Sequence, residues 1–127
     1  MALWAIACDL DVKAMKDAGL LRSEVTDFYN TVRGCFATYN FEKFHQLNLY
    51  TNDSPNAICD SFLVCQALTG IKDSEKFLKQ LDLLRFEHLN DLLPLVAPGR
   101  VSSSRDPIWD EIERVFHDEH AHAGSVR

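Results

Sequence analysis

The sequence predicts an α+β fold. Bulky and small side chains alternate over residues 2–10, as in a strand that packs one face on a core. Two amphipathic helical patterns follow, at 23–39 and 54–69, with strand-like segments between them and after them. The resulting order, β-α-β-β-α-β, is the ferredoxin-like sandwich with an antiparallel sheet. We expect this domain over residues 1–96, a linker over 97–105, and a C-terminal helix with a frayed tail over 106–127.

The first strand ends in two acids, in the stretch AIACDLDV at residues 5–12. Asp9 lies on a face of small side chains near the end of the strand, whereas Asp11 lies just beyond it. We expect Asp11 to cap a turn or short helix over 11–20, which ends at Gly19. The two faces of the strand are Trp4, Ile6, Cys8 and Leu10 on the core side, and Leu3, Ala5, Ala7 and Asp9 on the other.

The two long helices each have a start signal and an apolar stripe. Ser23 predicts the N-cap of the first, whose aromatic stripe indicates core packing. A strand, a bend near Gln46–Leu47 and a second strand follow. Ser54 and Pro55 predict the start of the second helix. The stripes are Val25, Phe28, Tyr29, Val32, Phe36 and Tyr39, then Ile58, Phe62, Cys65 and Leu68.

The last third of the chain predicts a helical turn at 74–80 and a strand at 81–87. Asn90 opens a short helix that tolerates Pro94 in its first turn. Asp106 predicts the cap of the C-terminal helix, with Pro107 at the first helical position. The apolar stripe of this helix needs a partner surface, either within the chain or across an oligomer. The stripe is Ile108, Ile112, Val115 and Phe116.

Composition narrows the function classes. The apolar runs are too short to span a bilayer, and the N-terminus lacks the basic region of a signal peptide, so we expect a cytoplasmic protein without a membrane partner. The four cysteines form no C-x-x-C pair and are expected to be buried free thiols. The net charge of −6 argues against a generic nucleic-acid coat. It leaves open an enzyme that engages a few phosphates through a metal or a local basic patch.

Topology predicts that two acids lie near each other. In a ferredoxin-like sheet the first and last strands are antiparallel neighbours, so Asp9 or Asp11 is expected near Asp82. Two neighbouring carboxylates can hold Mg²⁺ or raise one another's pKa for acid–base work. The alternative is that both are solvated strand-end residues, because Asp is common at turns.

Several short motifs resemble those of the virulence-associated protein D (VapD) family. They are ACDLD at the end of the first strand, YNTVR at 29–33, NF at 40–41, and QLNLYTNDSPNAICDSFLVCQAL at 46–68. Family members carry F-D-L in the first strand, Y-x-x-L/I-R in the first helix, and G-F leading to Q-G-S-V-Y. The resemblance covers about residues 2–96. The chain departs from it at Cys8, Leu47 and Asn48, which replace Phe, Gly and Ser.

The resemblance implies a dimeric ferredoxin-like fold, related to the small CRISPR-associated nuclease subunits. It also implies an endoribonuclease toxin (an RNA interferase) with an antitoxin protein as a further partner. Asp9 matches the acid of F-D-L, and Asp82 falls where members carry an acid at the start of the last strand. Asn48 and Tyr50 match the Ser and Tyr of Q-G-S-V-Y, and Arg33 matches the helix arginine. These three, together with His45, are the expected substrate-binding residues.

The mechanism that we expect joins the two lines of reasoning. In a homodimer, two Asp9 carboxylates bind Mg²⁺ or another divalent cation, with help from Asp82, and the metal activates water or the 2′-OH of RNA. The alternative is a non-catalytic dimeric scaffold that binds nucleic acid or a partner protein. The altered segment at 46–50 fits lost activity, and the C-terminal helix would then be the docking element.

Other polar residues have weaker patterns. His45, on the second strand, is a candidate acid–base group or RNA contact, or else a surface histidine. His117 and His120 share a helix face, which suits a weak zinc or nickel site or simply a frayed polar terminus. Five basic residues are candidates for phosphate contact, although a solvated or ion-paired role is the favoured interpretation of each: Lys13, Lys16, Arg22, Arg33 and Arg85.

Overall fold

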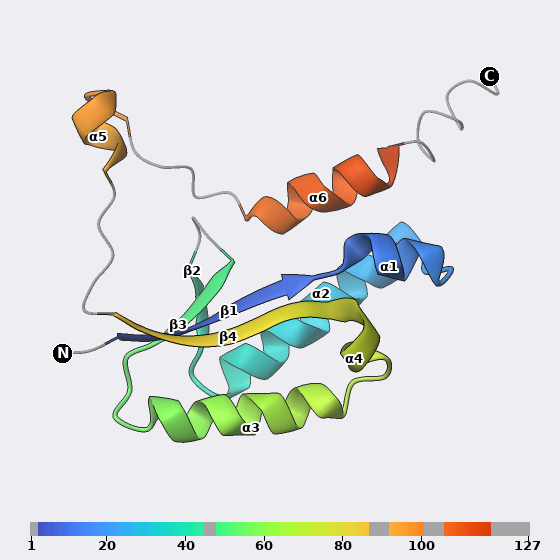
Figure 1. The fold of residues 1–127 in the computed structure, drawn as a ribbon, viewed down its shortest axis with the longest axis horizontal. Helices are drawn as coiled ribbons and strands as arrows, with labels where there is room; N and C mark the ends of the chain where they lie inside the picture. Colours follow the sequence, from blue (N-terminus) through green and yellow to red (C-terminus); the bar gives the residue numbers. More distant parts are fainter. Residues whose placement is uncertain (1–2, 45–47, 87–91, 101–105, 118–127) are drawn as a thin grey trace.

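The computed structural model describes residues 3–44, 48–86, 92–100 and 106–117, and all structural statements concern these. Four strands form one antiparallel sheet in the order β2-β3-β1-β4 (Figure 1). This arrangement confirms the predicted α+β, ferredoxin-like sandwich, with the first strand in the centre. The strands are β1 (Leu3–Leu10), β2 (Glu42–Phe44), β3 (Leu49–Asn52) and β4 (Leu78–Phe86).

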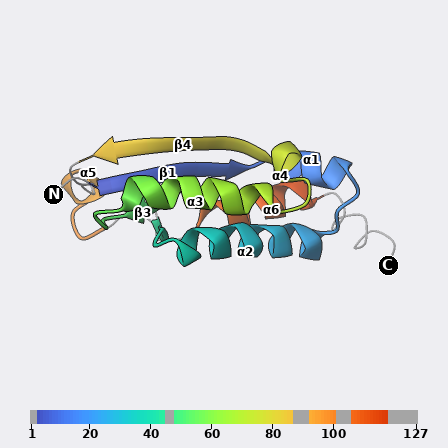
Figure 2. The same ribbon diagram turned by 90° about the horizontal axis from the view of Figure 1, so that it is seen from below.

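The long helices α2 and α3 lie on one side of the sheet, as Figure 2 shows, and no described helix covers the other face. In the described part of the chain, no helix combines the length and apolar character needed to cross a membrane. The helices are α1 (Val12–Asp17), α2 (Arg22–Thr38), α3 (Ala57–Thr69), α4 (Ser74–Phe77), α5 (Leu93–Val96) and α6 (Pro107–Val115).

The core lies between β1, β3 and α2. The predicted core face of β1 is confirmed at Ile6, Cys8 and Leu10, which are all buried, whereas Trp4 at the start of the strand is only partly buried. The aromatic stripe of α2 is also core, and the ring of Phe36 stacks on Tyr50 of β3 with centroids 4.0 Å apart. Residues at i, i+3, i+4 and i+7 of a helix share one face, which is why the α2 pattern was a reliable guide.

The C-terminal helix packs into the same core. Ile108, Ile112 and Phe116 are buried, and the ring of Trp109 meets Tyr29 of α2 edge-on at 5.3 Å. In Figure 2, α6 is seen between the sheet and α2. The partner surface that this helix needs is therefore supplied within the chain. The predicted cap is confirmed, since the amide of Ile108 donates to a carboxylate oxygen of Asp106 at 3.1 Å.

The predicted buried face of α3 is wrong at most positions. Ile58 and Phe62 are 45% and 69% exposed, and Cys65 is exposed, whereas only Leu68 is buried as expected. The helix is apolar nearly all round, so periodicity alone gives no unique orientation. A polar residue sets it: Asp60 turns inward, where its Oδ2 accepts from Asn52 Nδ2 at 2.9 Å. The buried residues are Ala57, Asp60, Ser61, Val64 and Leu68.

All four cysteines are free thiols, as predicted. Their expected burial holds for Cys8, and Cys35 is partly buried. Cys59 and Cys65 are exposed, because α3 is rotated away from the predicted orientation. The prediction of buried thiols is therefore wrong for the two cysteines of α3.

Both long helices begin at other residues than predicted. α2 begins at Arg22, so Ser23 lies in the first turn instead of capping it, and the amide of Leu21 donates to the carboxylate of Glu24 at 2.9 Å. α3 begins at Ala57, after a turn in which the Ser54 hydroxyl accepts from the amide of residue 56 at 3.3 Å. The helix ends at Gly70, as expected.

The last strand is longer than predicted. β4 begins at Leu78, so the helical turn before it ends at Phe77 and not at residue 80. Pro94 lies in the first turn of α5, as expected. The bend at Gln46–Leu47 and the helix start at Asn90 lie outside the described residues.

Candidate functional site

Asp9 lies near the end of the central strand, on the open face of the sheet. The register pairs Asp9 with Gln80 and Ala7 with Asp82 across β1 and β4. Paired residues of an antiparallel sheet project to the same side, so Asp9 and Asp82 share the open face as diagonal neighbours. Such neighbours have separations of about 7–8 Å. The topological prediction therefore brings both acids to one region of the sheet.

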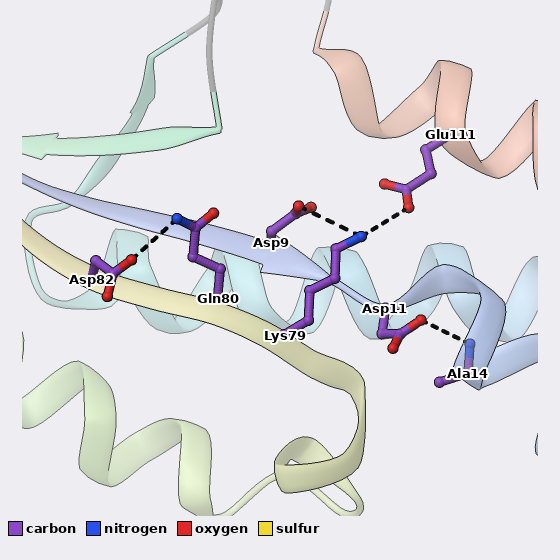
Figure 3. A network of polar contacts seen from close by, with 7 residues as sticks. All are labelled: Asp9, Asp11, Ala14, Lys79, Gln80, Asp82 and Glu111. Carbon is purple, nitrogen blue, oxygen red and sulfur yellow. Dashed lines mark hydrogen bonds and ion pairs between the residues drawn. The ribbon is translucent and has the colours of Figure 1, made fainter.

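Each acid nevertheless has its own partner. Asp82 is exposed and accepts a hydrogen bond from Gln80 Nε2 at 3.1 Å. Asp9 is half-buried and points to Lys79, whose Nζ lies 3.7 Å from Asp9 Oδ2 (Figure 3). The figure shows the two carboxylates turned toward these different partners and not toward each other. Within one chain they do not form a shared binding site.

A β-bulge places Lys79 beside Asp9. The register shifts between Asp9 and Leu10, which pair with Gln80 and Leu78, so Lys79 has no partner on β1. A bulge redirects a side chain in this way and is common beside functional sites. The Lys79 ammonium also lies 3.6 Å from Glu111 Oε1, which joins β1, β4 and α6 through one cation. Lys79 was not predicted as a site residue, since nothing in the sequence marks the bulge.

Asp11 has a structural role. Its carboxylate accepts from the amide of Ala14 at 3.0 Å and caps α1, as Figure 3 shows. The prediction that Asp11 caps the following turn is confirmed. The two acids of the strand end are therefore different: Asp11 satisfies a backbone donor, whereas Asp9 is held by an ion pair.

A buried polar cluster lies beneath α6. The side chain of Lys43 is only 3% exposed, and its Nζ lies 3.6 Å from Asp106 Oδ1 and 4.9 Å above the ring of Tyr50. The hydroxyl of Tyr29 donates to the other oxygen of Asp106. Burial lowers the pKa of Lys43, and the carboxylate of Asp106 partly opposes this effect. Burial, reinforced by the hydrogen bond to Asp106, raises the pKa of Tyr29.

Sequence reasoning missed this cluster. Its one sequence signal is the two-residue period of a strand, which places Lys43 on the same face as the buried Phe41. A lysine on an inward face needs a charge partner. That partner comes from Asp106, which is 63 residues away and which the sequence showed only as a helix cap.

Two of the expected substrate residues border a very small cavity. Asn48 and Tyr50 line it together with Cys8, Lys43 and Ile108, and its volume is about 10 Å³. This space holds at most one water molecule. Tyr50 is 2% exposed and belongs to the core, so neither its ring nor its hydroxyl faces a ligand in this structure. Burial raises the pKa of the Cys8 thiol to about 12, so Cys8 is not an activated nucleophile.

The other sequence candidates have varied positions. Arg33 is exposed on α2. Lys16 and Arg22 both contact α6, and the guanidinium of Arg85 lies 5.8 Å from the ring centroid of Trp4. His117 is exposed, whereas His45 and His120 lie outside the described residues.

The residues of one chain provide few ligands for a metal. No group of three His, Cys, Asp or Glu side chains in the described ranges is arranged to hold an ion. Carboxylate oxygens are the ligands that Mg²⁺ prefers, and the described acids of this sheet face are Asp9, Asp82 and, two strands away on β2, Glu42. The described residues of one chain therefore do not complete a metal site at Asp9.

Comparison with known proteins adds no family assignment. No protein-family model matches this chain, and no curated protein matches it significantly. The resemblance to the virulence-associated protein D family therefore stays a prediction that rests on the short motifs quoted above.

Proposed function

We propose that this chain is an endoribonuclease of the toxin type, which acts as a homodimer with Asp9 as its central acid. The observation that best supports the proposal is the position of Asp9, near the end of the central strand, half-buried on the open face and one diagonal step from Asp82. The fold agrees with the one that the motif resemblance implies.

The proposed dimer interface is the open face around β1. Ala5 and Ala7 lie on this face, but neighbouring side chains leave them only 0% and 9% exposed, so a second chain would meet those longer neighbours first. Leu84, which pairs with Ala5, is 43% exposed there and would lose water contact on association. A two-fold axis near Asp9 would bring the two Asp9 carboxylates together and so add to the ligands that the described residues of one chain provide.

A divalent cation held by the two Asp9 carboxylates would neutralise phosphate charge and activate the attacking oxygen. The chain's own residues have separate tasks. Asp9 provides oxygen ligands, and Asp82 would have to leave its hydrogen bond to Gln80 and turn toward Asp9 to add another. Lys79 keeps the Asp9 carboxylate oriented in the absence of substrate and offers a positive charge to an incoming phosphate.

The proposal is tested by Asp9→Asn, assayed for Mg²⁺-dependent cleavage of a single-stranded RNA and for dimer mass by light scattering. Asp27→Asn, an exposed acid on α2, is the matched control. We expect Asp9→Asn to lose at least about a hundred-fold in cleavage rate while dimer and fold persist. Growth arrest on expression should also be lost. Equal cleavage by Asp9→Asn and the control rejects the proposal.

A second candidate is the non-catalytic interaction module. The exposed apolar side chains of α3 and of the edge strand β4 favour it, because isolated domains seldom expose so many. They are Ile58, Phe62, Leu63, Leu81, Leu83 and Leu84. In this alternative an antitoxin or another protein covers these residues, and Asp9 serves only as the partner of Lys79. A stable dimer without RNA cleavage by the wild type would favour this function.

A further inference from the structure

The C-terminal helix is acidic, and it is bound by cations from four different elements. Residues 106–117 carry four acids against one arginine. Asp106 is paired with Lys43 of β2 at 3.6 Å, and Glu111 with Lys79 of β4 at 3.6 Å. Glu113 is paired with Arg22 of α2. Three acids of this segment thus each face a different cation of the body.

The carboxyl end of α6 is held by a fourth cation. The ammonium of Lys16 on α1 donates to the backbone carbonyl of Val115 at 3.0 Å and lies 5.5 Å from the ring centroid of Phe116. A helix carries partial negative charge at this end, so the contact is again cation to anion. The four cations, Lys16, Arg22, Lys43 and Lys79, are here called the cationic strip.

We infer that the cationic strip is a binding site for the phosphate backbone of single-stranded RNA, and that α6 occupies it in the resting protein as an internal polyanion. The choice of RNA as ligand rests on the proposed function. Four cations gathered along about 15 Å of one helix, in a chain of net charge −6, give a local basic patch of the kind that phosphates bind.

The strip leads to the proposed catalytic acid. Lys79 contacts Glu111 on one side and Asp9 on the other, as Figure 3 shows. A phosphate that replaced the Glu111 carboxylate would therefore contact the same ammonium group, that of Lys79, as Asp9 does. Release of α6 would also uncover Lys43 and Tyr50, because Ile108 closes the cavity that both residues line. It would expose the core side chains of Ile108, Ile112 and Phe116 as well, so phosphate binding has to offset this loss of packing. Lys43 and Tyr50 are thus buried here because α6 covers the proposed site.

The test compares two full-length triple variants of equal net charge. Asp106→Asn/Glu111→Gln/Glu113→Gln removes the acids that contact the strip. The control, Asp27→Asn/Asp53→Asn/Glu75→Gln, removes exposed acids that form no ion pair or side-chain hydrogen bond with α6 or with another described residue. The probe is a 2′-O-methyl oligouridylate in EDTA, which prevents cleavage. We expect the first variant to bind about ten-fold more tightly than the control, with a steeper salt dependence. Equal affinities overturn the inference.

A second measurement reports the position of α6 without altering its acids. In Trp4→Phe, Trp109 of α6 is the one remaining tryptophan, since the chain has two. Saturating probe should shift its emission to the red and raise its quenching by acrylamide, because the ring leaves its contact with Tyr29. Unchanged Trp109 fluorescence in the bound state also overturns the inference, since RNA then binds elsewhere.

Cleavage of unmodified RNA is scored separately from binding, so the two proposals fail independently. A chain that binds more tightly after loss of the α6 acids but never cuts RNA rejects the proposed nuclease alone. A chain that cuts through Asp9, with equal probe affinity in both triple variants, rejects the role of α6 alone.

Discussion

The ammonium of Lys79 lies 3.7 Å from the carboxylate of Asp9, held there by a bulge in β4. A cation in this position competes with a metal ion for the same oxygens. Because both side chains keep some contact with solvent, the competition is worth about 1 kcal/mol or less. Lys79→Met should therefore lower the Mg²⁺ concentration for half-maximal RNA cleavage by about two- to five-fold.

Lys76→Met is the matched control for this prediction. Lys76 also pairs with an acid, Asp73 at 3.5 Å, but it lies on α4 and is 68% exposed. A Mg²⁺ titration of cleavage should be the same for Lys76→Met and the wild type. If Lys79→Met requires as much Mg²⁺ as the control, the Asp9 carboxylate is not the position that the cation occupies.

We expect Asp11 to contribute to the stability of the fold and not to the cleavage of RNA. Replacing the N-cap of α1 in Asp11→Ala leaves the amide of Ala14 without its acceptor, which costs about 1 kcal/mol in the free energy of unfolding. Asp11→Asn should cost much less, because Asn caps helices as well as Asp does. Urea denaturation measures both. A cleavage defect in Asp11→Asn would contradict the separation of roles between the two acids of the strand end.

The parts of the fold that sequence predicted are those in which most of the large apolar side chains gather on one face. The β1 alternation and the α2 stripe were reliable because only one orientation buries their large side chains. For α3 the signal failed, since the helix is apolar all round and its rotation depends on Asp60. The partners of Asp60 belong to other segments of the chain.

The candidate site was only half predictable. Strand order and parity were enough to place Asp9 and Asp82 on one face. The contacts that govern Asp9 come from a bulge at Lys79 and from Glu111, which is about a hundred residues away in the chain. Neither a bulge nor a long-range ion pair has a local sequence signature. The sequence therefore predicted a pair of carboxylates, whereas the structure has a network in which Lys79 contacts Asp9 and Glu111.

The core position of α6 can be tested by two matched truncations. Ile112 on α6 is 2% exposed, and Ile58 on α3 is 45% exposed. Ile112→Ala should lower the free energy of unfolding by about 2–5 kcal/mol, because it removes buried methyl groups and leaves a cavity. Ile58→Ala should lower it by less than about 1 kcal/mol. Similar small losses for both variants would show that α6 is not part of the core.

The inward carboxylate of Asp60 predicts a pH-dependent contribution to stability. Hydrogen bonds from Asn52 above all, and from Asn40 and Ser54, lower the pKa of Asp60. The folded state therefore binds this proton less readily than the unfolded state. In Asp60→Asn an amide would face two amide donors, so the variant should be less stable than the wild type at neutral pH.

The sign follows from linkage. A carboxylate with a lowered pKa stabilises the fold above the pKa of the unfolded chain, about 4, and this contribution is lost as the pH falls below it. The stability difference between wild type and Asp60→Asn should therefore shrink between about pH 5 and pH 3. Asp53→Asn, an exposed neighbour, should show no such change in urea denaturation. A difference that stays constant over this range would contradict the role of the ionised carboxylate.

The buried thiol of Cys8 predicts that the free energy of unfolding decreases as the pH rises in the alkaline range. Burial raises the pKa of Cys8 to about 12, whereas an unfolded cysteine ionises near pH 8.5–9. Between these values the unfolded state releases a proton that the folded state retains, so the free energy of unfolding falls as the pH rises, by up to about 1.4 kcal/mol per pH unit.

Cys8→Ala removes this contribution, and its stability should fall less steeply above pH 9 than that of the wild type. Cys65→Ala, at an exposed cysteine of α3, is the control and should follow the wild type. Denaturation curves at several pH values give the slopes directly, and equal slopes for Cys8→Ala and Cys65→Ala would mean that Cys8 ionises without opening the core.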